Sequence, residues 1–587
     1  MTTRTLRPGA APRRRPVRAR AGLVALGAAA CLGLAACAAV PTSGPIEQGP
    51  VVDAGESSQF IRVIAAPPSM GASPTEIVRG FLEANASLES DHAIARRYLM
   101  PEASLAWEPD AATTVYQQSS LKLSEGQDGD ITARLAITYR LDDQGTLDPV
   151  DPASTERITF TLEQVVDDAS GMPQWRITDP PPGILVSDTD LRRAYRQYQV
   201  HYPSARSEAL VPDGRLLPVV GPSLPTALAE RVLSGPAEWL APGVRPGAPP
   251  GTALALGAVP VSNGVALVEL TDEALAATDV QRQDLAAQLT WTLTQLPEVT
   301  SVRLQVGGEP YVVPGAPDVM DRAVWQERSP DSLSTGSTGE ARLPYFVLEG
   351  SAVIRVTEDG RTAVPLEVPD AEALVDLGVA LDQRAAAAVE PDRTALWILP
   401  LDASITEQRV PGAQVGGASF DVDGQAWFTD SGRVLRVTPT GVPEEVPVQP
   451  ALAEPIASVH LARDGARVVL VSDGVLHLGV VQQGPSGLEI GSVRRIATTV
   501  SGVRDVAWRN SVTLDVLGQT DTSSFQVLRI GVGTGDAQPL GSPPDPREVT
   551  GAPGSATLVI GADDQLFANI GLQWRVQGPA RSVAYPG

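Results

Sequence analysis

The chain has 587 residues, and its 45 basic and 69 acidic side chains give a formal net charge of −24. So acidic a protein repels nucleic-acid phosphates and anionic lipid head groups. This excludes a general nucleic-acid-binding role and predicts that the protein reaches the membrane through lipid, not through a basic face. Cys31 and Cys37 are its only cysteines, so a disulfide framework is also excluded. The length is sufficient for three or more domains.

The N-terminus has the pattern of a bacterial lipoprotein signal. Residues 1–20 contain seven arginines and no acid, and residues 21–36 are an uncharged, apolar run. Sixteen residues are short for a membrane span, which needs about 20. The run ends at Leu34-Ala35-Ala36-Cys37, a lipobox in which small residues precede a nucleophilic thiol. A signal anchor or an ordinary cleaved signal is the alternative.

We therefore predict a signal peptide over residues 1–36 and lipidation at Cys37, as an S-diacylglycerol and N-acyl cysteine. This places the protein on the extracytoplasmic face of the cell membrane, held by lipid because two or more acyl chains anchor stably. Residues 37–59 are rich in Pro, Gly and Ser and are predicted to be a tether.

Residues 60–200 are predicted to form an α+β domain. Ser73-Pro74-Thr75-Glu76 is a helix start, and the helix places Ile77, Val78, Phe81 and Leu82 on one face. Asp91 is expected to open a second helix that Pro101 stops. Alternating apolar residues over 131–139 and 158–162 predict strands. Two helices before an antiparallel sheet indicate a cone-shaped roll, nuclear-transport-factor-like or cystatin-like.

Residues 205–315 are predicted to form a smaller α/β domain. Helices are expected over 225–233 and 280–296, and Asn263-Gly264 between apolar runs predicts a β-hairpin. Leu233-Ser234-Gly235-Pro236, this hairpin and the stretch 290–306 (TWTLTQLPEVTSVRLQV) resemble the GerMN domain. That resemblance implies a binding or assembly module without catalytic residues.

Residues 316–340 contain Pro, Gly and Ser and are predicted to be a linker, part of which could pack on a neighbouring domain. Residues 341–587 are all-β by pattern. Similar strings begin near residues 375, 416, 457 and 503, at the period of a four-stranded propeller blade. We predict a C-terminal β-propeller of five or six blades, with a β-sandwich as the alternative.

A search for catalytic and metal-binding motifs is negative. No phosphate-binding loop, HExxH, GxSxG or CxxC string occurs. The four histidines, His92, His201, His460 and His477, show no metal-ligand spacing, and we interpret His92 as a surface residue. Asp421-Val422-Asp423-Gly424 begins like a calcium loop, but position twelve is Gly432, so it is interpreted as a turn. No catalytic, cofactor or metal residue is predicted.

The whole chain resembles the LpqB family of actinobacterial lipoproteins. The matching features are the lipobox followed by VPTSGP, the string PTEIVRGFL at 74–82, ARRYL at 95–99, the GerMN strings, Arg463-Asp464-Gly465 and the terminal AYPG. Membership implies an extracytoplasmic protein that contacts the sensor kinase MtrB and modulates MtrA–MtrB signalling in envelope homeostasis and cell division. The alternative is a cell-wall glycan-binding protein or envelope hydrolase with its site on the propeller face.

Overall fold

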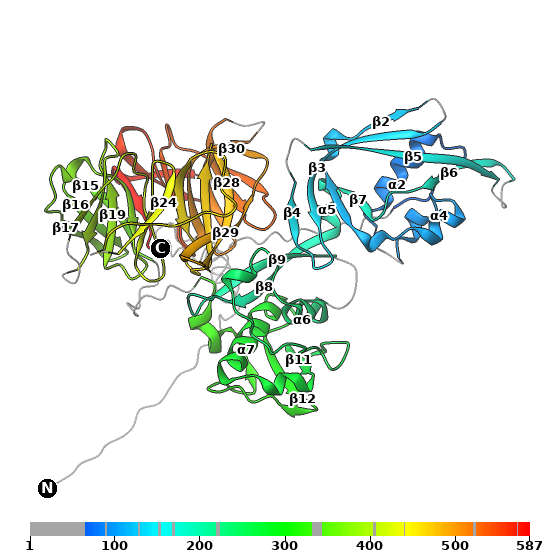
Figure 1. The fold of residues 1–587 in the computed structure, drawn as a ribbon, viewed down its shortest axis with the longest axis horizontal. Helices are drawn as coiled ribbons and strands as arrows, with labels where there is room; N and C mark the ends of the chain where they lie inside the picture. The colour runs from blue at the N-terminus through cyan, green and yellow to red at the C-terminus, as the bar shows by residue number, and fades with distance from the viewer. Residues whose placement is uncertain are drawn as a thin grey trace, which may run out of the picture. The chain divides into compact units, whose positions relative to one another are not determined.

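The computed structural model describes residues 65–587, apart from 88–90, 127–128, 151–153, 167–170, 219–223, 332–342, 403–406, 439–440, 521–523 and 572. Phe60–Gly587 forms one unit. It contains an N-terminal α+β module, a second α/β module and a β-propeller (Figure 1), which confirms the predicted fold class. Residues 1–36, Cys37 and the tether 37–59 lie outside the described residues.

The N-terminal helix forms as the sequence predicts. In α2 (Pro74–Ala84), Ser73 and Glu76 complete a capping box, and the inward residues Ile77, Val78 and Phe81 are buried. This apolar face packs on the sheet beside it. The sheet has the strand order β6-β5-β3-β1-β7, with β2 and β4 also paired to β3, and only β1 and β7 run parallel. Its strands are β1 (Thr113–Tyr116), β2 (Lys122–Glu125), β3 (Ile131–Leu141), β4 (Leu147–Pro149), β5 (Thr155–Val166), β6 (Pro173–Asp179) and β7 (Ile184–Ser187).

The predicted second helix is wrong in extent. Only α3 (Ala93–Arg96) forms, because Asp91 and His92 have φ of 56° and 54°, in the left-handed region that cannot start a helix. Pro101 begins α4 (Pro101–Ala106) rather than ending a helix, since proline at the first helical position loses no hydrogen bond. The module ends with α5 (Asp188–Ala194).

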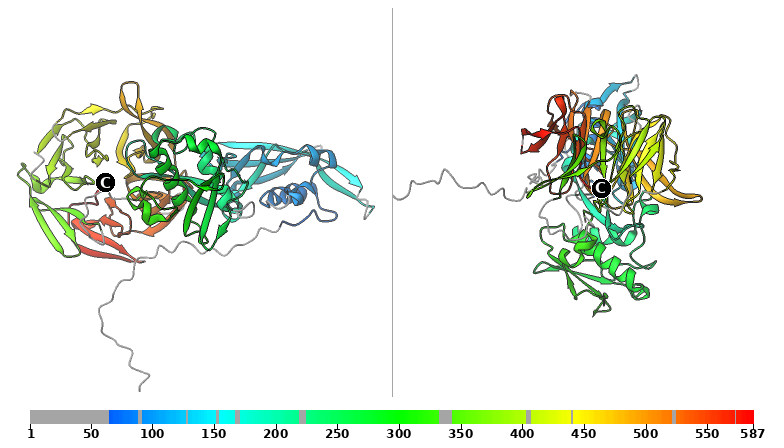
Figure 2. Two further views of the ribbon diagram at one scale, coloured as in Figure 1. Left: turned by 90° about the horizontal axis from the view of Figure 1, so that it is seen from below. Right: turned by 90° about the vertical axis from the view of Figure 1, so that its left-hand side faces the viewer.

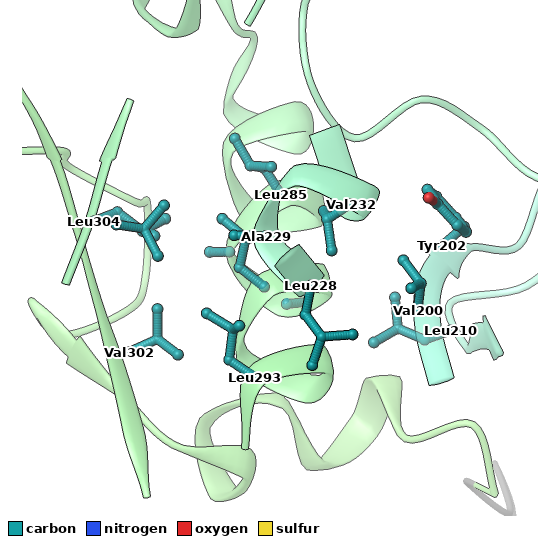
Figure 3. Close-up of a cluster of buried hydrophobic side chains, with 14 of the residues drawn as sticks. Val200, Tyr202, Leu210, Leu228, Ala229, Val232, Leu285, Leu293, Val302 and Leu304 are labelled. Carbon is teal, nitrogen blue, oxygen red and sulfur yellow. The ribbon is translucent and has the colours of Figure 1, made fainter. Parts of the chain in front are cut away.

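The second module surrounds one long helix, α7 (Asp279–Leu293), whose inward residues are fully buried. Figure 3 shows Leu285 and Leu293 of this helix between Leu228 and Val232 of α6 (Leu224–Ser234) and Val302 and Leu304 of β12. Asn263 and Gly264 both have positive φ and form the predicted hairpin turn. The strands are β8 (Tyr195–Pro203), β9 (Leu210–Pro218), β10 (Val261–Ser262), β11 (Val265–Leu270), β12 (Ser301–Val306), β13 (Glu309–Pro310) and β14 (Val319–Met320).

The first part of the predicted 316–340 linker belongs to the second module. β14 pairs with β12, and Met320 and Trp325 are buried in the same core as α7. Asp321 caps the short helix η5 (Arg322–Arg328) by accepting from two backbone N–H groups. The free energy gained by burying the Trp325 side chain holds this segment in the core, although its Pro-, Gly- and Ser-containing composition predicted a linker. Residues 332–340 lie outside the described residues.

Six four-stranded sheets form the propeller, the upper of the two predicted blade numbers (Figure 2, left). The C-terminal strand β38 pairs with β15 and closes the ring between first and last blade. The four similar sequence segments from which the blade period was predicted either lie in innermost strands or directly precede them. The sheets, each given from its innermost strand outward, are β38 (Ser582–Ala584), β15 (Tyr345–Glu349), β16 (Ala352–Thr357), β17 (Gly360–Pro365); β18 (Val375–Val379), β19 (Ala385–Val389), β20 (Ala395–Pro400), β21 (Gln408–Pro411); β22 (Ser419–Phe420), β23 (Ala426–Asp430), β24 (Arg433–Val437), β25 (Glu444–Glu445); β26 (Ile456–Leu461), β27 (Arg467–Ser472), β28 (Val475–Gly484), β29 (Gly487–Arg495); β30 (Val500–Asn510), β31 (Thr513–Thr520), β32 (Gln526–Gly531), β33 (Ala537–Gly541); β34 (Glu548–Thr550), β35 (Leu558–Ile560), β36 (Gln565–Ile570) and β37 (Gln573–Pro579).

Side chains join the three modules within this unit. Arg494 of β29 donates to Asp148 of the N-terminal module at 3.0 Å, and its guanidinium lies 4.3 Å from the ring centroid of Trp239 in the second module. Ala466 and Val480 of the propeller are buried in the same hydrophobic cluster as α7. Because one core and one cation–π contact span the boundaries, the modules form a common scaffold.

Candidate functional site

Five innermost propeller strands, and the segment just before the sixth (β22), place six residues at equivalent positions around the axis. Aligning these strands on their apolar residues puts Asp376, Gly417, Ser458, Asp505, Glu548 and Ser582 at the same position. The contacts agree with this ring. Glu548 Oε1 accepts from Ser582 Oγ at 2.8 Å, and a Cβ at Gly417 would lie 3.3 Å from Asp376 Cβ. Three of the six positions are therefore acidic, and the two small serines and the glycine leave space between them.

All of these residues except Ser582 line a cavity of about 490 Å³. The volume is in the range of small-molecule sites. Its wall includes Arg393, Arg504 and Arg547, together with His460 and Trp508. The chain's last residue, Gly587, also lines it, and Figure 2 (left) shows the C-terminus inside the ring of blades. The propeller thus provides a concave site with several convergent charged groups.

Burial and nearby like charges raise the pKa values of two carboxyl groups of the ring. Burial raises the pKa of Asp505 from 3.8 to about 7, against hydrogen bonds from the Val549 and Val506 N–H groups. Burial, with the nearby charges of Asp376 and Asp505, raises the pKa of Glu548 well above its usual range. Neighbouring like charges and low polarity both favour the neutral acid. Such perturbed carboxyl groups in a cavity are typical of functional sites.

Asp376 differs because it has a cationic partner. Its carboxylate forms an ion pair with Arg393, which also lines the cavity. The ring therefore combines an ion-paired carboxylate with two carboxyl groups whose pKa values are raised. A protonated acid beside an ionised one can donate and accept protons, and the same groups can bind a cationic or polyhydroxylated ligand.

A buried arginine fixes the chain beneath the cavity. Arg463 donates to the carbonyl oxygens of Pro586 at 3.0 Å, Trp508 at 2.9 Å and Gly551 at 3.3 Å. Burial lowers its pKa from 12.5 to about 10. These three carbonyls come from different parts of the ring and from the tail that follows β38. Arg463 therefore connects blades and tail at one point.

The predicted lipidation residue, Cys37, lies outside the described residues. The described part of the chain contains no group of three His, Cys, Asp or Glu side chains placed to hold a metal ion. Its helices include none that is long and apolar enough to cross a membrane.

The interpretation of His92 as a surface residue is wrong. His92 is buried, its ring packs edge-on against Trp107 with centroids 5.9 Å apart, and burial lowers its pKa. The left-handed backbone at Asp91 and His92 turns the imidazole inward, which a helical pattern does not anticipate. His201 is also buried beside Thr292, and burial lowers its pKa to about 3.

The other two histidines lie in blade strands. His460 of β26 lines the cavity, is 2.9 Å from Ser458 Oγ through Nε2, and has its pKa lowered to about 4 by burial. His477 lies in β28, where burial lowers its pKa. None of the four histidines is hydrogen-bonded to a carboxylate in the described residues, so no catalytic triad forms there.

The Asp421 segment is a structural turn, as interpreted from sequence. Asp421 Oδ1 accepts from the N–H groups of Asp423 and Gln425, and Oδ2 accepts from Trp427 Nε1 at 2.9 Å. The lone pairs of the Asp421 carboxylate that accept these hydrogen bonds are not available to bind a metal ion. Arg206 of the second module also donates to Asp421 and Asp423, so the turn is a contact between modules.

Sequence reasoning missed the acidic ring. Asp376 and Asp505 stand at the same place in two of the strings that revealed the blade period, directly before an apolar residue. This shared position could have predicted part of the acidic ring from sequence, since one position in successive inner strands lines a propeller axis. Glu548 could not be predicted in the same way, because its strand has only three residues and was not among the recognised repeats.

Comparisons with known proteins cover nearly the whole described chain. Three family models match: "Lipoprotein LpqB, N-terminal domain" over residues 67–192, "Sporulation and spore germination" over 199–312 and "Lipoprotein LpqB beta-propeller domain" over 351–586. The chain belongs to the LpqB lipoprotein family. The predicted resemblance, including the GerMN domain, is thereby confirmed, and family membership indicates a lipid-anchored membrane protein.

Whole-length relatives support this assignment. The Lipoprotein LpqB of Thermobifida fusca is 28% identical over 95% of this chain and 98% of its own, and that of Streptomyces coelicolor is 26% identical over 99% of both. Among solved structures, TolB from Acinetobacter baumannii matches 43% of this chain and 69% of its own with 16% identity and a TM-score of 0.34. The tandem GerMN domains of GerM from Bacillus subtilis match 29% and 60%, with 18% identity and a TM-score of 0.20.

Proposed function

We propose that this protein is a non-enzymatic regulator, anchored through Cys37 to the extracytoplasmic face of the cell membrane. It modulates a sensor kinase of the MtrA–MtrB type by contact with the extracytoplasmic domain of MtrB, in envelope homeostasis and cell division. The supporting observation is that the second module shares a core with the propeller, and that charged contacts join the propeller to both other modules. A scaffold of this kind presents binding surfaces in fixed relative positions, which lowers the entropic cost of binding a partner.

Anchoring adds to this mechanism. A lipid-held protein and an integral membrane kinase meet at high effective concentration, so that weak contacts are sufficient. The lipid is then part of the regulatory mechanism in addition to determining location.

A reconstituted system tests the proposal. The lipidated protein and the full-length kinase are placed in the same proteoliposomes, and kinase autophosphorylation is measured against the protein-to-kinase ratio. We expect the phosphorylation rate to change saturably with this ratio. A kinase output that is independent of the protein, together with no measurable affinity for the isolated kinase ectodomain, would falsify the proposal.

The acidic ring favours a second candidate, a cell-wall glycan-binding protein or glycan hydrolase with its site in the propeller cavity. Glycoside hydrolysis uses two carboxyl groups, one protonated and one ionised. Asp505 and Glu548, with raised pKa values, and the ion-paired Asp376 supply both states in one cavity.

Binding and turnover assays on cell-wall glycans separate the two candidates. The E548Q and D505N variants remove one ionisable group each while keeping side-chain size. If the cavity acts on glycans, both variants lose binding or turnover and the kinase effect is unchanged. Equal behaviour of the variants and the parent protein on every glycan eliminates this candidate.

A further inference from the structure

Three basic side chains lie in register across the sheet of the N-terminal module. Lys122 of β2 is directly opposite Arg134 of β3, and Arg134 is directly opposite Arg157 of β5. We call these three residues the basic row. Side chains that face each other across strands are about 5 Å apart, so the row is about 10 Å long.

The row points away from the core. Side chains alternate between the two faces along a strand. The neighbours Ala133 and Leu135 of β3 are fully buried in the cluster that contains α2, so Arg134 between them is on the opposite face. All three members of the basic row are exposed.

No acidic side chain in the described part of the chain pairs with the row. Across the described residues, none of the three side chains takes part in an ion pair or a side-chain hydrogen bond, whereas Arg140 farther along β3 is paired with Glu156 at 2.8 Å. Like charges directly opposite each other destabilise a sheet. The chain as a whole is strongly acidic, so three adjacent unpaired cations are a local reversal of its charge.

We propose that the basic row binds the anionic phospholipid surface of the membrane and holds the N-terminal module against it. Three adjacent cations on one exposed sheet face can contact phosphate head groups together, and each cation contributes favourably near such a surface. The acidic groups elsewhere do not prevent this, because charges beyond about 8 Å are largely screened at physiological ionic strength.

The length of the chain between Cys37 and the N-terminal module supports the membrane surface as the partner of the basic row. The N-terminal module is the first after Cys37, and residues 38–64 between them span at most roughly 90 Å even when fully extended. The inference rests on the membrane anchoring in the proposed function, since lipidation at Cys37 would keep the row within reach of head groups.

Vesicle flotation tests the proposal without the lipid anchor. The mature chain carrying C37S is mixed at physiological ionic strength with vesicles of phosphatidylcholine alone or with added phosphatidylglycerol. We expect binding to the anionic vesicles only. The triple variant K122Q/R134Q/R157Q should bind them about tenfold or more weakly, as expected when three surface cations are removed.

A matched variant controls for net charge. R97Q/R303Q/R575Q removes three other exposed arginines and should bind as the parent does. The proposal is overturned by absent binding, by equal binding to neutral vesicles, or by equal loss in both triple variants. It is also overturned if soluble poly-glutamate, but no vesicle, binds through the row, since an acidic protein would then be the partner.

A solution measurement separates this outcome from failure of the proposed function. Affinity of the C37S chain for the isolated kinase ectodomain does not depend on vesicles. Lost vesicle binding with intact ectodomain affinity rejects the basic row alone, whereas lost ectodomain affinity with intact vesicle binding rejects the kinase proposal alone.

Discussion

Arg206 and Asp421 are 215 residues apart in sequence, yet Arg206 Nη2 lies 3.3 Å from Asp421 Oδ2. The same nitrogen donates to Asp423 at 2.7 Å. Asp421 is almost completely buried, whereas Asp423 is mainly exposed. A turn that stabilises one blade is therefore also one of the contacts of the second module with the propeller.

Replacing Arg206 by Ala should weaken the attachment between these modules. Asp421 would lose its cationic partner but keep three other donors, so we expect a loss of about 2 kcal/mol in the free energy of unfolding. Chemical denaturation measures it. R433A, which breaks an exposed pair with Glu445, is the control and should cost less than about 1 kcal/mol. Equal effects of the two variants would contradict a special role for Arg206.

D421A should be far more damaging than D423A. Asp421 accepts from two backbone N–H groups and from the buried indole of Trp427, and removing it leaves these donors unsatisfied. We expect at least about 3 kcal/mol for D421A and less than about 1 kcal/mol for D423A. Thermal unfolding of both variants checks the difference, and similar melting temperatures would show that the turn does not depend on Asp421.

Asp505 should make stability depend on pH. Its folded-state pKa of about 7 lies above the unfolded value of 3.8, so the folded protein favours the protonated acid. The stability that this provides is full below pH 4 and is lost as pH rises through 7, by up to about 4 kcal/mol. D505N should flatten the profile of unfolding free energy over this window. The exposed control D318N should leave the profile unchanged, and a D505N profile parallel to the parent's would contradict the shift.

Trp325 should behave as a core residue although it lies in the segment first predicted as a linker. It is buried in the cluster around α7, and Trp291 Nε1 donates to its carbonyl at 3.3 Å. W325A should therefore destabilise the protein by about 3 to 5 kcal/mol. V324A changes the half-exposed neighbour and should cost less than about 1 kcal/mol, measured in the same urea titration. A small effect of W325A would restore the linker interpretation.

Cys37 should determine both location and output. C37A removes the thiol that accepts lipid, so the protein is expected in the soluble extracytoplasmic fraction after cell fractionation. Because effective concentration at the membrane falls, its effect on kinase output should fall at least about tenfold at equal expression. A C37A protein that is released yet regulates normally would show that the anchor determines location alone.

Local sequence patterns determined most of the elements. The capping residues Ser73 and Glu76, the Asn263-Gly264 turn and the alternation in β3 each depend on interactions within a few residues, which is why they were predicted correctly. The propeller architecture was predicted from the repeat period, because each repeat corresponds to one four-stranded blade. The helix expected from Asp91 failed because two residues adopt a left-handed backbone that composition does not specify.

Only the tertiary structure decided which distant residues meet. Asp376, Asp505 and Glu548 form one site because blade closure brings the inner strands around an axis. The raised pKa values of Asp505 and Glu548 arise from burial and from nearby like charges that no single strand contains. The contact of Arg206 with Asp421 and the alignment of Lys122 with Arg134 and Arg157 likewise depend on module packing and strand register. Sequence determines local conformation through short-range sterics and hydrogen bonds, whereas sites depend on long-range packing.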